Sequence, residues 1–228
     1  MEEASLIELK DFNDFYNACN HYGIEINNNQ LDMFKKYYKI LLDWNKKINL
    51  ISRKGEDSII EKHFLDSIIF LPEIENLFPS SLLDIGSGGG FPAIPLAIMK
   101  SDWDFVLCES IKKKAIFLGH LVNELNLQNK ITIINDRVEM LRETSLPLCS
   151  KFDLIAARAV GKLDVLIKYA MPLLKKGGYL IAYKAKDIED EIKDAEALIS
   201  KNNLKLKIFS KKINEAERKL ITIQPGYS

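Results

Sequence analysis

A carboxylate beside a run of glycines is the part of this sequence best suited to bind a ligand. In the stretch "SLLDIGSGGGFPAI", Asp84 is followed by Gly86, Gly88 and Gly90. Glycine adopts positive φ angles and carries no Cβ, so the backbone at these positions can approach a ligand closely. The stretch joins a β-rich run to a helical run, and open α/β sheets bind ligands at such junctions. We therefore predict that these four residues contact a cofactor.

The neighbouring residues indicate the charge of that cofactor. Gly88 to Ala93 satisfies the relaxed dinucleotide pattern G-x-G-x-x-A, which is weak evidence by itself. The carboxylate of Asp84 would repel a pyrophosphate, and Pro92 and Pro95 remove N–H donors from the helix start that would bind it. S-adenosylmethionine carries an ammonium and a sulfonium and no phosphate, so it fits the same residues. An NAD(P)-dependent oxidoreductase and a non-catalytic nucleotide-binding module are the alternatives.

A second carboxylate, Glu109, ends the next β-rich run, "DFVLCE". At this position it could accept hydrogen bonds from both hydroxyls of a cofactor ribose. Its alternative role is to cap the helix predicted by "ESIKKKAIF". After the third predicted strand, residues Asp136 to Glu139 could border the adenine.

The elements that must position these residues change in type once along the chain. Residues 1–78 form a predicted helical region, because apolar residues recur there every three or four positions. From residue 79 to 228, β-rich and helical runs alternate, which favours a parallel sheet with helices on both faces. The expected parallel strands are 81–85, 104–109, 130–134, 152–157 and 177–184. Residues 204–225 predict an antiparallel hairpin at one edge.

Composition limits the compartment and the partners. The 228 residues are 47% hydrophobic, enough for one large core or a core with a small appended domain. Three widely spaced cysteines and three histidines without a cluster predict neither disulfides nor a metal site. The N-terminus is acidic, and no apolar run reaches the roughly 18 to 20 residues of a membrane span. We therefore expect a cytoplasmic protein without a membrane or metal partner.

A formal net charge of zero hides an uneven distribution. Residues 1–80 contain nine basic and 14 acidic residues, whereas residues 111–186 contain 14 basic and six acidic ones. A basic central segment favours an anionic partner, and nucleic acid is the one we expect. For any single lysine, a solvated helix face is the alternative.

Five motifs follow one another along the chain: "NLISRKGEDSIIEKHFLDSI", "LLDIGSGGGFPAIPLAI", "INDRVEML", "AARAVGKLDVLIKYAMPLLKKGGYLIAYKAK" and "EDEI". In this order and spacing they resemble the RsmG (GidB) family of bacterial 16S rRNA guanine-N7 methyltransferases. The resemblance spans Asn49 to Ile192. It implies a Rossmann-like class I methyltransferase fold with a mostly parallel seven-stranded sheet. The N-terminal helical region, residues 1–78, would then precede an S-adenosylmethionine-dependent methyltransferase domain, residues 79–228. The implied substrate is the decoding-region loop of 16S rRNA, presented as naked rRNA, an assembly intermediate or the small subunit.

The resemblance also assigns residues. Matched by position, the family's cofactor contacts fall on Gly86, Phe91, Val138, Glu139 and Arg158. Family-pattern positions outside the glycine loop are Asn49, Arg53, His63, Asp66 and Ser67. The chain departs from the family at Ala93 and Ala185, where glycine is usual. Our candidates for RNA contact are Arg53, Lys54, His63, Lys112, Lys113, Lys114, Lys184 and Lys186.

The sequence also limits the reaction. The fourth predicted strand ends in "LIAARAV" and lacks the Asn/Asp-Pro-Pro-aromatic element that methylates exocyclic amines, and no Pro-Cys pair supplies a nucleophile for cytosine C5. Guanine N7 has a free lone pair, so its methylation needs positioning and no general base. Because N7 faces the deep, narrow major groove of A-form RNA, the target should be unpaired. Arg158 would hold the cofactor or an RNA oxygen, with a structural salt bridge as the alternative. We expect a monomer.

Overall fold

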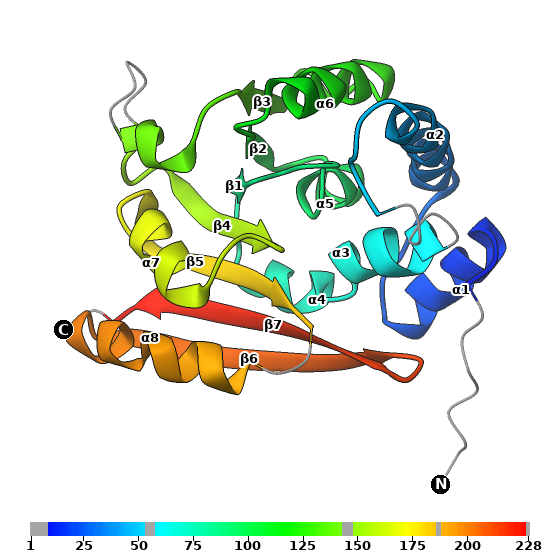
Figure 1. Cartoon of the computed structure of the whole chain (residues 1–228). Helices are drawn as coiled ribbons and strands as arrows, with labels where there is room; N and C mark the ends of the chain where they lie inside the picture. Colours follow the sequence, from blue (N-terminus) through cyan, green and yellow to red (C-terminus); the bar gives the residue numbers. More distant parts are fainter. Residues whose placement is uncertain (1–8, 53–57, 143–147, 186–187, 227–228) are drawn as a thin grey trace, which may run out of the picture.

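The computed structural model describes residues 9–52, 58–142, 148–185 and 188–226, and it contains a seven-stranded sheet with helices on both faces (Figure 1). The strands are β1 (Ser81–Ile85), β2 (Asp104–Cys108), β3 (Ile131–Ile134), β4 (Phe152–Arg158), β5 (Leu174–Lys184), β6 (Leu204–Ile213) and β7 (Ala216–Pro225). Their order is β3-β2-β1-β4-β5-β7-β6. Strands β1 to β5 are parallel, and β7 is antiparallel to both β5 and β6. The predicted parallel sheet and edge hairpin are thus confirmed, and the strand order reverses between β1 and β4.

Helices cover both faces of this sheet. One face carries α1 (Phe12–His21), α2 (Asn28–Asn45), η2 (Ile60–Leu65), α3 (Asp66–Ile68), α4 (Leu71–Glu75), α5 (Ala93–Met99) and α6 (Lys112–Glu124). The other face carries η3 (Val138–Arg142), α7 (Leu163–Ala170) and α8 (Glu189–Lys201). Alternation along β1 sends Leu82 into the first core and Leu83 into the second. The N-terminal helices share the first core with the sheet, because Phe34 and Phe64 belong to the same cluster as Phe105.

The elements differ from the prediction mainly at their ends. Helix α1 begins at Phe12 because the side chain of Asp11 accepts the N–H groups of Asn13 and Asp14. Residues 138–142 form a short 3₁₀ helix. Strand β5 begins at Leu174, earlier than residue 177, because Leu174 pairs with Phe152 of β4.

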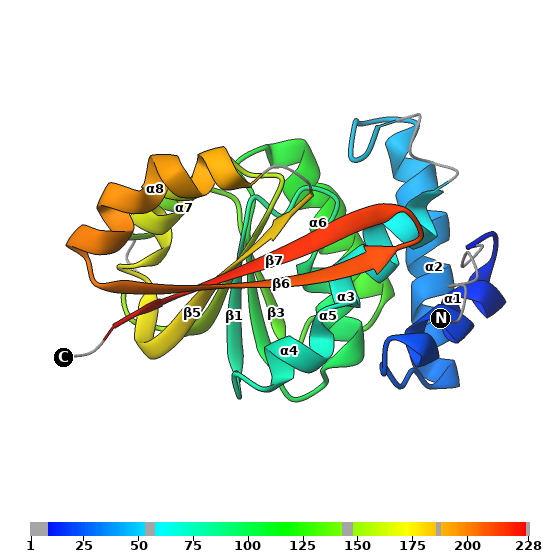
Figure 2. The same cartoon turned by 90° about the horizontal axis from the view of Figure 1, so that it is seen from below.

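The β6–β7 hairpin crosses the molecule and brings its turn to the N-terminal helices (Figure 2). The hydroxyl of Tyr22 donates to the carbonyl oxygen of Lys212 at 2.5 Å. Lys211 Nζ reaches Glu73 at 2.9 Å and the carbonyl oxygen of Ile69 at 2.8 Å. The hairpin therefore fixes the helical region against the edge of the sheet. Within the described ranges, no helix is long and apolar enough to cross a membrane.

Candidate functional site

The glycine loop after β1 has a shape that requires glycine at three positions. Gly86, Gly88 and Gly90 have φ angles of +70°, +54° and +96°. A Cβ on Gly86 would lie 2.7 Å from Val160 Cγ2, and one on Gly90 would lie 2.7 Å from the hydroxyl of Tyr37. A Cβ on Gly88 would meet only the carbonyl oxygen of Gly86, at 3.8 Å. The loop is therefore tightly packed on both sides and open at Gly88, where a ligand can approach the backbone.

Helix α2 holds this loop through a residue that sequence analysis missed. Tyr37 is fully buried, and its hydroxyl donates to the carbonyl oxygen of Gly89. Its ring stacks on Phe91, with centroids 5.5 Å apart and planes 16° apart. The only signal in the sequence was a tyrosine on the apolar face of a helix, since a buried tyrosine hydroxyl needs a partner.

Asp84 lies at the end of β1 and is fully buried. Neither of its carboxylate oxygens has a hydrogen-bond partner among the described residues. Burial raises the pKa of Asp84 well above its usual range and outweighs the opposing effects of the nearby Ser87 hydroxyl, the Ala93 N–H and Arg158, of which the first two lie outside hydrogen-bond geometry. A buried carboxyl group without a partner is costly, and a cationic ligand would offset that cost. Asp84 therefore fits a ligand that brings a positive charge or a donor to this loop.

A cavity of about 260 Å³ opens beside the glycine loop at the carboxyl ends of the first strands. Its lining residues are Ile85, Gly86, Cys108, Ser110, Asp136, Arg137, Val138, Glu139, Val160 and Tyr169. The predicted cofactor contacts Gly86, Val138 and Glu139 thus lie around one cavity, together with Asp136 from the predicted adenine border. The hydroxyl of Tyr169 donates to Glu139 Oε1 at 2.8 Å and so fixes this carboxylate at the rim.

Glu109 joins the glycine loop to α6. Its side chain is nearly buried, with Oε2 accepting the N–H of Gly88 and Oε1 accepting the N–H of Ile111, both at 2.8 Å. The carboxylate therefore sets the position of Gly88 and holds Ile111, the residue just before α6, but α6 has no side-chain cap, so the alternative interpretation of Glu109 as a helix cap is wrong. Each oxygen keeps a lone pair for a further donor. The contact to a ribose stays a prediction.

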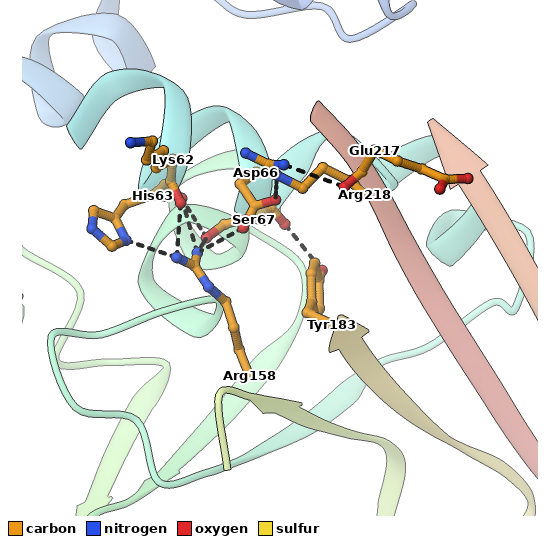
Figure 3. Close-up of polar contacts among 8 residues, drawn as sticks. All are labelled: Lys62, His63, Asp66, Ser67, Arg158, Tyr183, Glu217 and Arg218. Carbon is orange, nitrogen blue, oxygen red and sulfur yellow. Dashed lines mark hydrogen bonds and ion pairs between the residues drawn. The ribbon is translucent and has the colours of Figure 1, made fainter. Parts of the chain in front are cut away.

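Arg158, at the end of β4, reaches across to the N-terminal region (Figure 3). Its Nη2 donates to the carbonyl oxygen of Lys62 at 2.8 Å and contacts His63 Nδ1 at 2.7 Å. Its Nη1 donates to Ser67 Oγ at 3.1 Å and to the carbonyl oxygen of His63 at 3.3 Å. Residues 60–65 form a π-helix, a geometry that often marks a functional site. Arg158 therefore has a structural role, and the salt bridge predicted as its alternative is the contact with Asp66.

This contact defines the state of His63. An arginine only donates hydrogen bonds, so Nδ1 of His63 accepts and Nε2 carries the proton. Burial, with Arg158 and Lys62 nearby, lowers the pKa of His63 to about 3. The ring also stacks on Phe91, with centroids 4.9 Å apart. His63 is therefore neutral at physiological pH and packed between a cofactor-loop residue and Arg158.

Asp66 links Arg158 to the edge hairpin. Its Oδ2 lies 3.3 Å from Arg158 Nη1, and its Oδ1 lies 2.7 Å from Arg218 Nε (Figure 3). Burial raises the pKa of Asp66, and the two arginines act in the opposite direction. The hydroxyl of Tyr183 in β5 donates to the carbonyl oxygen of Ser67 at 3.0 Å. Sequence analysis singled out Asp66 and Ser67 but missed Arg218 and Tyr183, which only the folded sheet brings to them.

The predicted RNA-contact residues do not form one group. Lys112 and Lys113 are exposed at the start of α6. Lys184 lies 2.6 Å from Glu191 and donates to the carbonyl oxygen of Gly161, which leaves its side chain only 14% exposed. Arg53, Lys54 and Lys186 lie outside the described residues.

The structure also places Ala93, one of the departures from the family, and bears on metal binding. Ala93 is fully buried at the first position of α5, so its methyl group packs into the core. Among the described residues, no group of three or more His, Cys, Asp or Glu side chains could hold a metal ion.

Comparison with known proteins places this site in a family. The GidB family model, described as rRNA small subunit methyltransferase G, matches residues 30–221. A relative of that name from Carboxydothermus hydrogenoformans is 39% identical over 186 residues, which cover 82% of this chain and 78% of the relative. Another from Lachnoclostridium phytofermentans is 34% identical and covers 95% of this chain and 90% of its own length. The O-methyltransferase from Bacillus cereus, solved in complex with SAH, has the same fold, with a TM-score of 0.61, 14% identity, and coverage of 95% of this chain and 100% of that one. With a family model matched over most of its length and relatives above 30% identity, this chain belongs to the GidB family.

Proposed function

We propose that this protein transfers a methyl group from S-adenosylmethionine to N7 of a guanine in the decoding-region loop of 16S rRNA. The observation that carries the proposal is the fully buried carboxyl group of Asp84, which has no hydrogen-bond partner in the described part of the chain and adjoins the glycine loop. The names of its relatives, ribosomal RNA small subunit methyltransferase G, support the substrate class.

The residues around the cavity fit the proposed cofactor. Asp84 would attract its cationic amino-acid portion, and Gly88 leaves the backbone open for close approach. Glu109 would accept from the ribose, while Val138 and Glu139 would border the adenine across the 260 Å³ cavity. Gly86, Gly90 and Phe91 would shape the loop around it. When bound, S-adenosylmethionine supplies a sulfonium methyl group that a neutral nucleophile can accept.

The chain's own residues suit an acceptor that needs no deprotonation. Guanine N7 holds a free lone pair, and the methylated base becomes positively charged. His63 is neutral and adds no positive charge next to the product, and Arg158 is paired with Asp66, a carboxylate that it shares with Arg218. The role of Arg158 is then to fix the loop through Phe91, over whose ring its guanidinium carbon lies at 5.3 Å.

The same features weaken the alternatives. A dinucleotide would place its pyrophosphate near the partnerless carboxyl group of Asp84 and at a helix start that carries Pro92. A non-catalytic module would bind the cofactor without turnover. The enzyme is proposed to act in the cytoplasm as a monomer on 16S rRNA, an assembly intermediate or the small subunit. The helical region 1–78 and the methyltransferase domain 79–228 are the proposed units.

Mapping the methylated nucleotide tests this function. Purified protein, S-adenosylmethionine and either 16S rRNA or small subunits lacking the modification are incubated, and the rRNA is treated with borohydride and aniline, which cleave at 7-methylguanosine. We expect one cleavage site, in the decoding-region loop, and weaker cleavage with the Asp84→Asn variant at an S-adenosylmethionine concentration that does not saturate it. A methyl group recovered on an exocyclic amine or a carbon would refute the N7 assignment. Cofactor binding without any transfer would support the non-catalytic module.

A further inference from the structure

A second cavity, of about 340 Å³, is lined by residues that follow α2 and by residues at the start of α6. Figure 1 shows these two helices on the same face of the sheet. Its lining residues are Lys47, Ile48, Asn49, Ile111, Lys113 and Lys114. Three of these six residues are lysines and none is acidic. In the part of the chain that the structure describes, none of the three lysines forms an ion pair. The cavity therefore carries positive charge that no described carboxylate pairs with, and an anion could bind there.

Contacts between α2 and α6 hold the two helices together beside this cavity. Trp44 of α2 meets Phe117 of α6 edge to face, with ring centroids 5.6 Å apart. Farther along the same helix pair, Lys36 Nζ lies 2.8 Å from Glu124 Oε2. Lys36 is paired with an acid at that end, whereas at the cavity no described carboxylate pairs with the lysines, and Lys47 Nζ lies over the Trp44 ring, 5.8 Å from its centroid. The difference indicates that the cavity end is adapted to an external anion.

The segment that contributes Lys47 and Asn49 is also held in place. Asn45 is buried, and its side-chain oxygen accepts the N–H groups of Leu50 and Ile51, each at 3.0 Å. These bonds fix the turn after α2 and the residues it carries. The cavity is thus formed by anchored backbone, even though Lys47 and Lys113 are exposed.

The lysine cavity adjoins the cofactor cavity. Ser110 lines the cofactor cavity and the next residue, Ile111, lines the lysine cavity. Between them, Glu109 accepts hydrogen bonds from Gly88 of the glycine loop and from Ile111. An anionic chain bound at the lysines would therefore pass beside the cofactor loop.

We propose that Lys47, Lys113 and Lys114 form a subsite for a backbone phosphate of the RNA whose guanine is methylated. The proposal rests on the proposed function, because it takes RNA to be the substrate. Lys113 and Lys114 were candidates from sequence, whereas Lys47 joins them only through the packing of α2 on α6. Lysine binds phosphate as a point charge, so this subsite positions the strand without selecting its sequence.

Salt-dependent RNA binding tests the subsite. The probe is a fluorescently labelled oligoribonucleotide with the sequence of the decoding-region loop, titrated with the full chain at several salt concentrations. For Lys47→Gln and Lys113→Gln we expect RNA affinity to fall about three- to tenfold, and the slope of log affinity against log salt to lose about 0.7 for each lysine removed. The matched control is Lys193→Gln, which removes an exposed lysine of α8 on the other face of the sheet. Cofactor affinity and melting temperature should stay at wild-type values in all three variants.

The outcomes separate this proposal from the proposed function. If wild-type protein methylates N7 while the cavity variants match Lys193→Gln in slope, affinity and KM for RNA, the subsite is refuted and the function stands. If wild-type protein yields no 7-methylguanosine but the cavity variants still lose slope on RNA, the subsite stands and the function is refuted. Tight calorimetric binding of inorganic phosphate, unchanged by competing RNA, would make the cavity a free-anion site and overturn the proposal.

Discussion

Two carboxylates on neighbouring strands, Asp84 of β1 and Asp153 of β4, have opposite surroundings. Asp153 Oδ2 accepts hydrogen bonds from both the N–H and the hydroxyl of Ser80 and of Ser81, at 2.8 to 3.1 Å, and Lys175 Nζ lies 2.9 Å from Oδ1. Burial raises its pKa, but these donors outweigh burial and lower the pKa to about 2. Asp84 has no partner among the described residues, and its pKa is raised well above the usual range.

The contrast distinguishes the two ends of the sheet. Asp153 lies near the amino end of β4, where its partners tie three segments of the chain together. Asp84 lies near the carboxyl end of β1, beside the glycine loop. The amino end is thus satisfied by the protein itself, whereas the carboxyl end is left incomplete in the way expected of a binding site.

The largest expected effect comes from Asp84→Asn. Losing the negative charge should weaken S-adenosylmethionine binding by about 10- to 100-fold, since a hydrogen bond to a charged group contributes about 1.5–3 kcal/mol. The variant should also raise the free energy of unfolding of the ligand-free protein at pH 7. Because folding raises the pKa of Asp84, this residue destabilises the folded protein increasingly as pH rises above the pKa of the unfolded chain, and asparagine removes that effect. Calorimetry and thermal melts would measure both. A lower melting temperature with unchanged cofactor affinity would show that Asp84, at the carboxyl end of its strand, stabilises the fold and does not bind the cofactor.

Arg158→Met tests whether the contacts of Arg158 serve ligand binding, as proposed for Asp84, or stabilise the fold, as Asp153 does. The change leaves Asp66 with Arg218 alone and removes the donors to Lys62 and Ser67. We expect the free energy of unfolding to fall by about 2–3 kcal/mol, because a buried carboxylate loses one partner. Urea denaturation measures this change, and Arg158→Lys is the matched variant that keeps the charge but loses the planar donors. Wild-type stability in both variants would show that the contacts of Arg158 serve ligand binding alone.

For Asp153→Asn the effect should be on stability and smaller. Because folding lowers the pKa of Asp153, this residue stabilises the folded protein at any pH above the ordinary pKa of aspartate. That contribution is lost as the pH falls toward about 2. At pH 7 we expect the free energy of unfolding to decrease by about 1–2 kcal/mol, with cofactor affinity at the wild-type value. Comparing urea midpoints at pH 7 and pH 3 checks the sign, because the two proteins should converge at low pH. Weakened cofactor binding would contradict the division between the two ends.

The smallest effect at neutral pH is expected from His63→Gln. Because the pKa of His63 is lowered to about 3, the folded protein keeps the ring neutral while the unfolded chain takes up a proton below about pH 6.5. Wild-type stability should therefore fall as pH drops from 6.5 toward 3, and the variant should lose less. The rate of methyl transfer should be nearly flat from about pH 6.5 to 8.5 in the wild type, since no group must titrate. A rate that follows an ionisation near neutral pH would identify a general base.

The sequence predicted more of the fold than of the contacts within the site. Alternating β-rich and helical runs located all seven strands, because periodicity records which side chains must be buried. Asp84 and the three glycines could be identified as a loop because glycine at positive φ and a carboxylate in an apolar strand are local features. The 3₁₀ helix at 138–142 and the early start of β5 could not, because strand pairing and packing decide them.

The chain by itself determined where a ligand loop must lie and which family the protein resembles, since both depend on residue types at short spacing. Tertiary structure alone decided that Tyr37 holds Gly89, that Arg218 shares Asp66 with Arg158, and that Lys47 joins Lys113 at one cavity. The partners in these contacts are between 52 and 152 residues apart. No local pattern encodes such pairs, because they exist only once helices and strands have packed against one another. The same packing left Asp84 buried without a partner, which is the feature that points to the ligand.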